Sequence, residues 1–165
     1  MKTYKGRYTV KNPKKYCGDA SDVIYRSGWE RSVMLWCDRN DQIVEWSSEE
    51  IVIPYRYDLD KSVRRYFVDF YIKYKNGKTL LVEVKPNKQT KPPEGKRRTK
   101  KYLNEAATYV MNQNKWESAK MFAEKKGWEF TIWTEVELKK MGILPKGHKK
   151  PLKKMPPYRK PKKKS

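Results

Sequence analysis

Three charged side chains interrupt two apolar stretches in the middle of the sequence. Asp69 lies within RRYFVDFYIKYK (64–75), and Glu83 and Lys85 lie at the end of KTLLVEVK (78–85). Charges on a strand that faces a core cost free energy unless they are paired or used. Glu83 and Lys85 are two residues apart, so in a strand both side chains point to the same face. These three side chains are therefore the first candidates for chemistry.

The residues between the two stretches predict how the stretches meet. Positions 76–77 are Asn-Gly, which is typical of a two-residue turn, so we expect two antiparallel strands of one hairpin. Strand alternation places Phe67, Asp69 and Tyr71 on one face of the first strand. Pairing of the two strands is then expected to bring Asp69 beside Glu83 on one surface.

Asp69 and Glu83, once paired, would place two negative charges side by side. Such carboxylates repel each other, and a divalent cation relieves the repulsion. We therefore expect the two side chains to bind Mg²⁺, with Mn²⁺ as a substitute. A bound Mg²⁺ holds a phosphate oxygen and a water, and Lys85, about 6.6 Å along the strand from Glu83, would orient the water or stabilise charge on the phosphate. The structural alternative is an exposed Glu83–Lys85 ion pair with Asp69 as a surface acid.

The composition of the chain argues against several other kinds of site. His148 is the one histidine and lies in a segment rich in Lys and Pro, so enzymes that use a histidine base are not expected. Cys17 and Cys37 lack the spacing of zinc ligands. No run of about 18 apolar residues is present, so no transmembrane helix is predicted. The formal charge of +21, from 40 Lys and Arg against 19 Asp and Glu, favours a polyanionic partner.

Apolar periodicity and turn signals predict the elements that position these residues. A helix is expected over 27–38, where Trp29, Val33 and Trp36 recur with helical spacing. The other expected segments are strands at 42–46, 49–55, 64–75, 78–85 and 128–133, and helices at 99–112, 114–127 and 134–143. This order predicts an α/β domain with a central mixed β-sheet flanked by helices.

An acid on one strand followed by Glu-x-Lys on the next resembles the PD-(D/E)xK nuclease superfamily. The stretches YRSGWE (25–30), VEVKPNKQTKPP (82–93) and RRTKKYLNEAATY (97–109) further resemble the head-completion nucleases of T-even-like tailed phages, which belong with the TnsA-type endonucleases. The resemblance covers about residues 4–144, although Val68 stands where a proline usually precedes the first acid. It implies a restriction-endonuclease-like core of α-β-β-β-α-β order and a metal-dependent DNA endonuclease that acts in phage head completion after DNA packaging.

The resemblance also implies a catalytic set. Carried over by position, the set comprises Glu30, Asp69, Glu83 and Lys85. In this reading Glu30 is a further metal ligand beside the two strand acids. Glu30 has a structural alternative, because Ser27 three residues earlier fits a capping box at the start of the helix.

A basic loop rich in proline follows the second hairpin strand directly. We expect its lysines and arginines to contact the phosphates of duplex or branched DNA without reading base sequence. Gln89 is included because some members of the resembled family place a site glutamine there. The predicted nucleic-acid-binding residues are Lys88, Gln89, Lys91, Lys96, Arg97, Arg98, Lys100 and Lys101.

The last residues of the chain differ in composition from the rest. We expect a nuclease domain over 1–144 and a flexible basic tail over 145–165, because a segment rich in Lys and Pro without acids cannot build a core. The tail would bind DNA or acidic surfaces of phage head or portal proteins. The expected location is the host cytoplasm during infection, or the virion. The alternative function is a basic virion plug that closes the filled head and touches DNA without cutting it.

Overall fold

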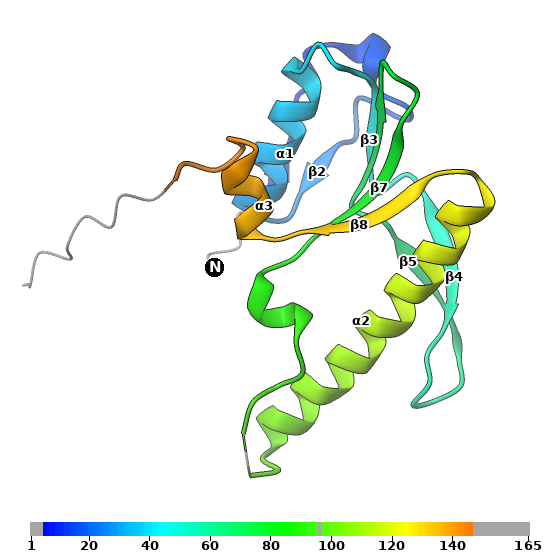
Figure 1. Ribbon diagram of the computed structural model, residues 1–165, viewed down its shortest axis with the longest axis vertical. Helices are drawn as coiled ribbons and strands as arrows, with labels where there is room; N and C mark the ends of the chain where they lie inside the picture. Colours follow the sequence, from blue (N-terminus) through cyan, green and yellow to red (C-terminus); the bar gives the residue numbers. More distant parts are fainter. Residues whose placement is uncertain (1–4, 96, 147–165) are drawn as a thin grey trace, which may run out of the picture.

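A four-stranded mixed sheet forms the centre of the protein (Figure 1). Its strands, in order across the sheet, are β3 (Ile43–Ser48), β6 (Phe70–Tyr74), β7 (Thr79–Val84) and β8 (Glu129–Trp133). The β3–β6 and β6–β7 pairs are antiparallel, and the β7–β8 pair is parallel. The structure is a computed structural model that describes residues 5–95 and 97–146.

Helices cover both faces of this sheet, and the alternation of β7 shows how. Leu81 packs in one cluster with residues of α2 (Lys100–Lys125), whereas Leu80 and Val82 pack in a second cluster with residues of α1 (Gly28–Arg39). All three leucine and valine side chains are buried. The predicted central mixed sheet flanked by helices is therefore confirmed, and its α2 face is the face toward which Leu81 and its alternation partner Glu83 point.

The predicted hairpin is also confirmed, but the expected two-residue turn is wrong, because Tyr74 lies opposite Lys78 and the loop therefore holds three residues, 75–77. β6 and β7 pair in antiparallel register, with Phe70 opposite Val82 and Lys73 opposite Thr79. Gly77 has a φ of 87°, a left-handed conformation that glycine adopts without the steric cost of a Cβ atom.

The expected single strand over 64–75 is wrong, because the chain bends at residues 68–69. Two strands result, β5 (Val63–Phe67) and β6, and β5 pairs with β4 (Val52–Arg56) in a separate two-stranded sheet. Glu49, opposite the bend, has a φ of 55°, and its N–H donates to the Asp69 carbonyl at 3.2 Å.

The bend shifts the alternation of side chains by one residue. Tyr66 and Val68 pack in the same cluster as α2, and Tyr71 packs against that cluster too, whereas Phe67 is 45% exposed. The expectation that Phe67 shares a face with Asp69 and Tyr71 is therefore wrong, and Tyr66 takes that place.

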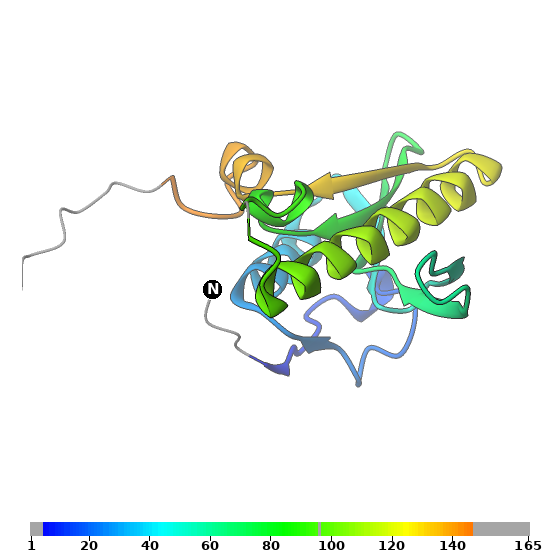
Figure 2. The ribbon, with the colours of Figure 1, turned by 90° about the horizontal axis from the view of Figure 1, so that it is seen from below.

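The two helices predicted over 99–112 and 114–127 form one helix, α2, which runs unbroken along the sheet (Figure 2). Asn114 does not cap a second helix. Its side chain instead accepts a hydrogen bond from the Asp58 N–H at 3.0 Å and donates to the Asp58 carboxylate at 2.9 Å. Thr99 caps the start of α2, and Gly127, with a φ of 72°, follows its end as expected.

The remaining elements are short. They are β1 (Gly6–Arg7), η1 (Pro13–Lys15), β2 (Ile24–Tyr25), η2 (Asn87–Thr90) and α3 (Glu135–Lys140). Within residues 5–95 and 97–146, no helix has the length and apolar character needed to cross a membrane. The predicted tail at 145–165 lies outside the described residues from position 147 onward, as does Lys96.

Candidate active site

The β6–β7 hairpin brings Asp69 and Glu83 to the same place. Phe70 pairs with Val82, so in this antiparallel register Asp69 is the next residue along from Phe70 and faces Glu83. The Asp69 carboxylate accepts a hydrogen bond from the N–H of Val84 at 2.9 Å, which joins the bend to the end of β7. The bend after β5 thus fixes the first acid against the strand that carries the second.

Glu83 is held at both of its carboxylate oxygens. Glu83 is 6% exposed and lies on the α2 face of the sheet. The Tyr66 hydroxyl donates to Glu83 Oε2 at 2.5 Å, and Lys85 Nζ lies 3.4 Å from Glu83 Oε1. The ion pair with Lys85 is thus shielded from solvent rather than exposed on a solvated sheet face.

Tyr66 is a site residue that the sequence patterns did not indicate. Simple alternation over 64–75 places it on the face opposite Asp69, and only the bend at 68–69 turns its hydroxyl toward Glu83. Burial raises the pKa of the Tyr66 hydroxyl, and the carboxylates of Glu83 and Asp69 raise it further. Tyr66 therefore stays protonated and donates its hydrogen bond to Glu83.

The electrostatics of the site favour a bound cation. Burial raises the pKa of Asp69 well above its ordinary value, and the carboxylates of Glu83 and Glu30 raise it further, while Lys85 opposes the rise. Ionised Asp69 therefore lies in a negative environment that Lys85 only partly offsets. A divalent cation between Asp69 and Glu83 would relieve this repulsion.

Glu30 lies in the first turn of α1 and takes part in the hydrogen bonds at the start of that helix. Its N–H donates to the side chain of the N-cap residue Ser27 at 3.2 Å, and its carboxylate accepts from the Arg26 N–H at 2.9 Å. The side chain thus reaches back past the cap, as in a capping box shifted by one residue. Burial raises the pKa of Glu30, with Glu49 adding to the rise.

The three predicted acids do not converge on a single point. Within residues 5–95 and 97–146, no three Asp, Glu, His or Cys side chains are close enough together to hold a metal ion. Glu30 acts on Asp69 through its charge, and Glu49, another nearby acid, pairs with Arg26 at 3.0 Å. Asp69 and Glu83 alone still suit Mg²⁺, because this ion keeps several waters and is usually held by one or two carboxylates together with substrate phosphates.

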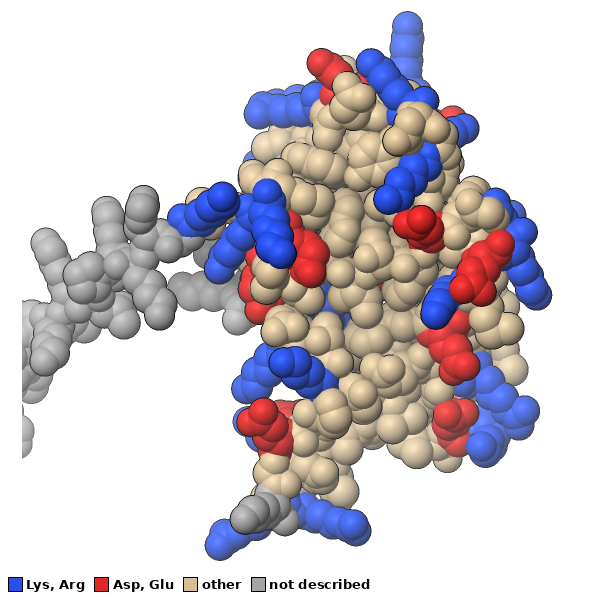
Figure 3. Space-filling view, in the orientation of Figure 1, with Lys and Arg blue, Asp and Glu red and all other residues tan. Residues whose placement is uncertain are grey.

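The predicted DNA-binding residues that the structure describes lie in one segment, residues 86–95 and 97–101, which we call the basic arm. It leaves the end of β7, passes through η2 and turns into α2 at the lower end of the molecule, where Lys and Arg side chains gather (Figure 3). The Asn87 N–H donates to the Glu135 carboxylate at 2.9 Å and ties the arm to α3. All the predicted residues that the structure describes here are exposed, namely Lys88, Gln89, Lys91, Arg97, Arg98, Lys100 and Lys101.

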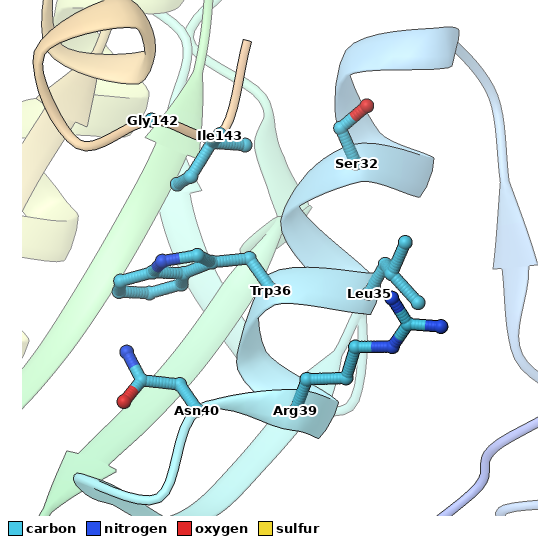
Figure 4. A pocket seen from close by; sticks show the side chains of 7 residues that line it. All are labelled: Ser32, Leu35, Trp36, Arg39, Asn40, Gly142 and Ile143. Carbon is cyan, nitrogen blue, oxygen red and sulfur yellow. The ribbon is translucent and has the colours of Figure 1, made fainter.

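Two hollows lie outside the acid pair. One of about 360 Å³ lies between α1 and the residues after α3, and Trp36 and Ile143 point into it (Figure 4). Among the described residues, no carboxylate lines it, and Arg39 brings a positive charge to its wall. The other, of about 520 Å³, borders the basic arm at Pro86 and Lys88 and is completed by Trp29 and residues of α3.

Comparison with known proteins assigns the chain to a family. A family model described as TnsA-like endonuclease N terminal matches residues 40–135, a range that includes Asp69, Glu83 and Lys85 but leaves out Glu30. The chain belongs to the TnsA-like endonuclease family. It is also 39% identical over 145 residues to the head completion nuclease of Enterobacteria phage T4, and the match covers 85% of this chain and 97% of that protein.

Family membership confirms two of the expectations from the sequence. The resemblance to TnsA-type and head-completion nucleases is confirmed by both comparisons. The mixed sheet between α1 and α2 agrees with the restriction-endonuclease-like core expected for such an endonuclease. The roles of the individual site residues stay predictions.

Proposed function

We propose that this protein is a Mg²⁺-dependent endonuclease that hydrolyses phosphodiester bonds of DNA. The observation that carries the proposal is the meeting of Asp69, Glu83 and Lys85 on the β6–β7 hairpin, within the range that matches the endonuclease family. The set combines two carboxylates for a metal with a lysine for a water or a phosphate, which is what metal-assisted phosphodiester hydrolysis requires. No histidine is needed for this chemistry.

Each residue of the set has a distinct proposed role. Asp69 and Glu83 hold the metal, which when bound lowers the pKa of a water and neutralises charge on the phosphate. Lys85, whose Nζ lies 3.4 Å from Glu83 Oε1, orients the attacking water or stabilises the phosphate. Glu30 acts on the site through its charge, while its carboxylate accepts from the Arg26 N–H at the start of α1. We propose that it would have to move to become a ligand of the metal.

Tyr66 is expected to hold Glu83 in the orientation that binds metal. Tyr66→Phe removes the hydrogen bond to Glu83 Oε2 and is expected to weaken Mn²⁺ binding or cleavage about 10-fold, the usual effect of losing a partner of a metal ligand. Calorimetric Mn²⁺ titration and a cleavage assay measure the two quantities. Tyr109→Phe, at a tyrosine of α2 that makes none of these contacts, is the matched control. Unchanged Mn²⁺ affinity and unchanged cleavage in Tyr66→Phe would contradict this role.

We further propose that the basic arm holds the DNA backbone. Replacing both Arg97 and Arg98 by Ala removes two exposed cations and is expected to lower DNA affinity at every sequence tested. The slope of log affinity against log salt should become shallower by about 1.8, which is about 0.9 for each duplex phosphate contact. The double variant of Arg31 and Arg39, exposed on α1, is the control with the same change of charge. Equal slopes for the two double variants would contradict the proposal that the basic arm binds the DNA backbone.

The biological setting of the proposal comes from the relative. Because that protein is a head completion nuclease, we propose that this chain cuts DNA during completion of the phage head, in the host cytoplasm or in association with the virion. Head or portal proteins are then partners, and the basic residues from 145 onward are candidates to bind either them or DNA.

A cleavage assay with the full chain tests the proposed function. Supercoiled, linear and branched DNA are incubated with Mg²⁺, with Mn²⁺ or with EDTA, and we expect cuts in at least one DNA form that require the metal. If every form stays intact with both metals, the enzyme proposal is wrong and the non-catalytic basic plug replaces it. Equal binding of RNA and DNA without metal dependence or cleavage would indicate a general nucleic-acid-binding protein.

A further inference from the structure

Lys115 is a half-buried lysine of α2 on the helix face that packs against the sheet. It lies one turn from Met111 on one side and one turn from buried Ala119 on the other, and both of these residues belong to the cluster that covers the sheet. Its Nζ lies 5.6 Å from the ring centre of Tyr66 and 5.9 Å from that of Tyr55. A lysine on the apolar face of a helix is unusual and calls for a partner.

The ring of Tyr66 connects this ammonium group to the acid pair. Tyr66 carries the hydroxyl that donates to Glu83, so the ring beside Lys115 ends at the candidate metal ligand. Rings at these distances attract a cation through their faces without neutralising it. Burial lowers the pKa of Lys115, while the charge of Glu83 raises it, that of Lys85 lowers it and that of Asp69 raises it, so the ammonium group feels the charges of the site.

Lys115 nevertheless forms no ion pair. Over residues 5–95 and 97–146, no Asp or Glu oxygen lies within 4.0 Å of its Nζ, whereas Lys85 is paired with Glu83 at 3.4 Å. Of the two lysines near the site, Lys85 pairs with the proposed metal ligand Glu83. Lys115, on α2, pairs with no carboxylate of the described residues. A partly desolvated ammonium that feels the charges of two carboxylates without pairing with either is suited to an anion that arrives with a metal.

We propose that Lys115 is a substrate-binding residue that contacts a non-bridging oxygen of the DNA phosphate held at Asp69 and Glu83. The phosphate would then lie between the end of β7 and the middle of α2, on the α2 face of the sheet. The basic arm runs from the end of β7 to the start of α2, so DNA bound along the arm would reach the site at the end of β7 that Lys115 faces across from α2. This inference rests on the proposed function, because it assigns a residue to the same site.

The experiment compares Lys115→Met and Lys115→Arg with Lys120→Met, a matched loss of charge at an exposed position of the same helix. DNA binding in Ca²⁺ is measured against salt, cleavage is followed in single turnovers at saturating DNA, and Mn²⁺ binding is measured by calorimetry without DNA. For Lys115→Met we expect a salt slope shallower by about 0.9 and a cleavage rate lower by about 100-fold. Lys115→Arg should retain the slope, and Lys120→Met should behave as wild type.

The Mn²⁺ titration separates substrate binding from a structural role. Removal of a nearby positive charge cannot weaken a metal site electrostatically, so Mn²⁺ affinity should stay equal or increase in Lys115→Met. A loss of Mn²⁺ affinity means that Lys115 only positions Glu83 and overturns the inference. A wild-type salt slope in Lys115→Met overturns it as well.

Failure of this inference can be told from failure of the proposed function. If wild type binds DNA but never cuts it, the endonuclease proposal falls while the salt slope still tests Lys115. If Lys115→Met does not fold, as judged by its thermal unfolding, Lys115→Gln gives the same loss of charge with a polar head group. A wild-type salt slope in that variant overturns the inference too.

Discussion

Asp69→Asn is expected to abolish metal-dependent DNA cleavage while making the metal-free protein more stable. Asp69 is a half-buried residue, and burial together with the charges of Glu83 and Glu30 raises the pKa of its carboxyl well above the ordinary value. Asn retains the oxygen that accepts the Val84 N–H but removes the charge. Metal catalysis contributes several kcal/mol to phosphodiester cleavage, so the expected loss is about 1,000-fold or more.

The stability gain in Asp69→Asn should depend on pH. The raised pKa means that Asp69 binds a proton more tightly in the folded protein than in the unfolded chain, where its pKa is about 3.9. The native state therefore holds more protons than the unfolded state above that pH, and the stability of wild type falls as pH rises through this window. The Asn variant lacks this contribution, so its advantage in unfolding free energy should grow from about pH 4 upward until folded Asp69 is ionised.

Denaturant unfolding of both proteins across pH, without and with Mg²⁺, measures this effect. Mg²⁺ should stabilise wild type by binding the native state and should leave Asp69→Asn unchanged. Asp41→Asn, an exposed carboxylate, is the control that removes one charge elsewhere. A variant that cuts DNA at the wild-type rate, or a wild type that gains no stability from Mg²⁺, would contradict the assignment of Asp69.

Glu83→Gln and Lys85→Met are both expected to lower cleavage by about 1,000-fold, but to change metal binding in opposite directions. Glu83→Gln removes a proposed ligand and should weaken Mn²⁺ binding, although Gln still accepts from the Tyr66 hydroxyl. Lys85→Met removes the cation 3.4 Å from Glu83 and should leave Mn²⁺ affinity equal or greater. The first variant thus tests metal holding and the second tests the step after metal binding.

Single-turnover cleavage and calorimetric Mn²⁺ titration of both variants check this pair of results. Lys78→Met removes the cation of an exposed ion pair with Glu129 on the same sheet and serves as the control. Wild-type cleavage in either site variant would exclude that residue from the chemistry. A weaker Mn²⁺ affinity in Lys85→Met would make the lysine a support for Glu83 and not a partner of water or phosphate.

The part of the site that the sequence predicts is the part that local rules determine. Asp69 and Glu83 lie at the same end of a hairpin, so the Asn-Gly signal is enough to bring them near each other, whereas the three-residue loop at 75–77 sets the register that places them opposite each other. The glycine needed for a left-handed turn residue is present at position 77. The family resemblance added Glu30 as a ligand, which stays a prediction, and the structure shows that its side chain also makes hydrogen bonds at the start of α1.

The rest of the site depends on contacts between distant segments. The bend at residues 68–69 that carries Tyr66 to Glu83 is Val-Asp and contains neither glycine nor proline, so no turn signal marks it. Asn114 lies inside the unbroken α2, and its side chain binds Asp58, 56 residues earlier, a contact that no local pattern predicts. Lys115 did leave a signal, because helical spacing from Met111 and Ala119 places a charge on the apolar face of α2.

A crystal of the full chain soaked in Mn²⁺ tests the central claim most directly, because Mn²⁺ is identified by its anomalous scattering. We expect a peak between Asp69 and Glu83, with one oxygen of each carboxylate about 2.1 Å from the ion and waters in the other positions. The contrary result is a map without a peak there at a Mn²⁺ concentration that supports cleavage, or a peak held by Glu30 and Glu49 without Asp69 and Glu83.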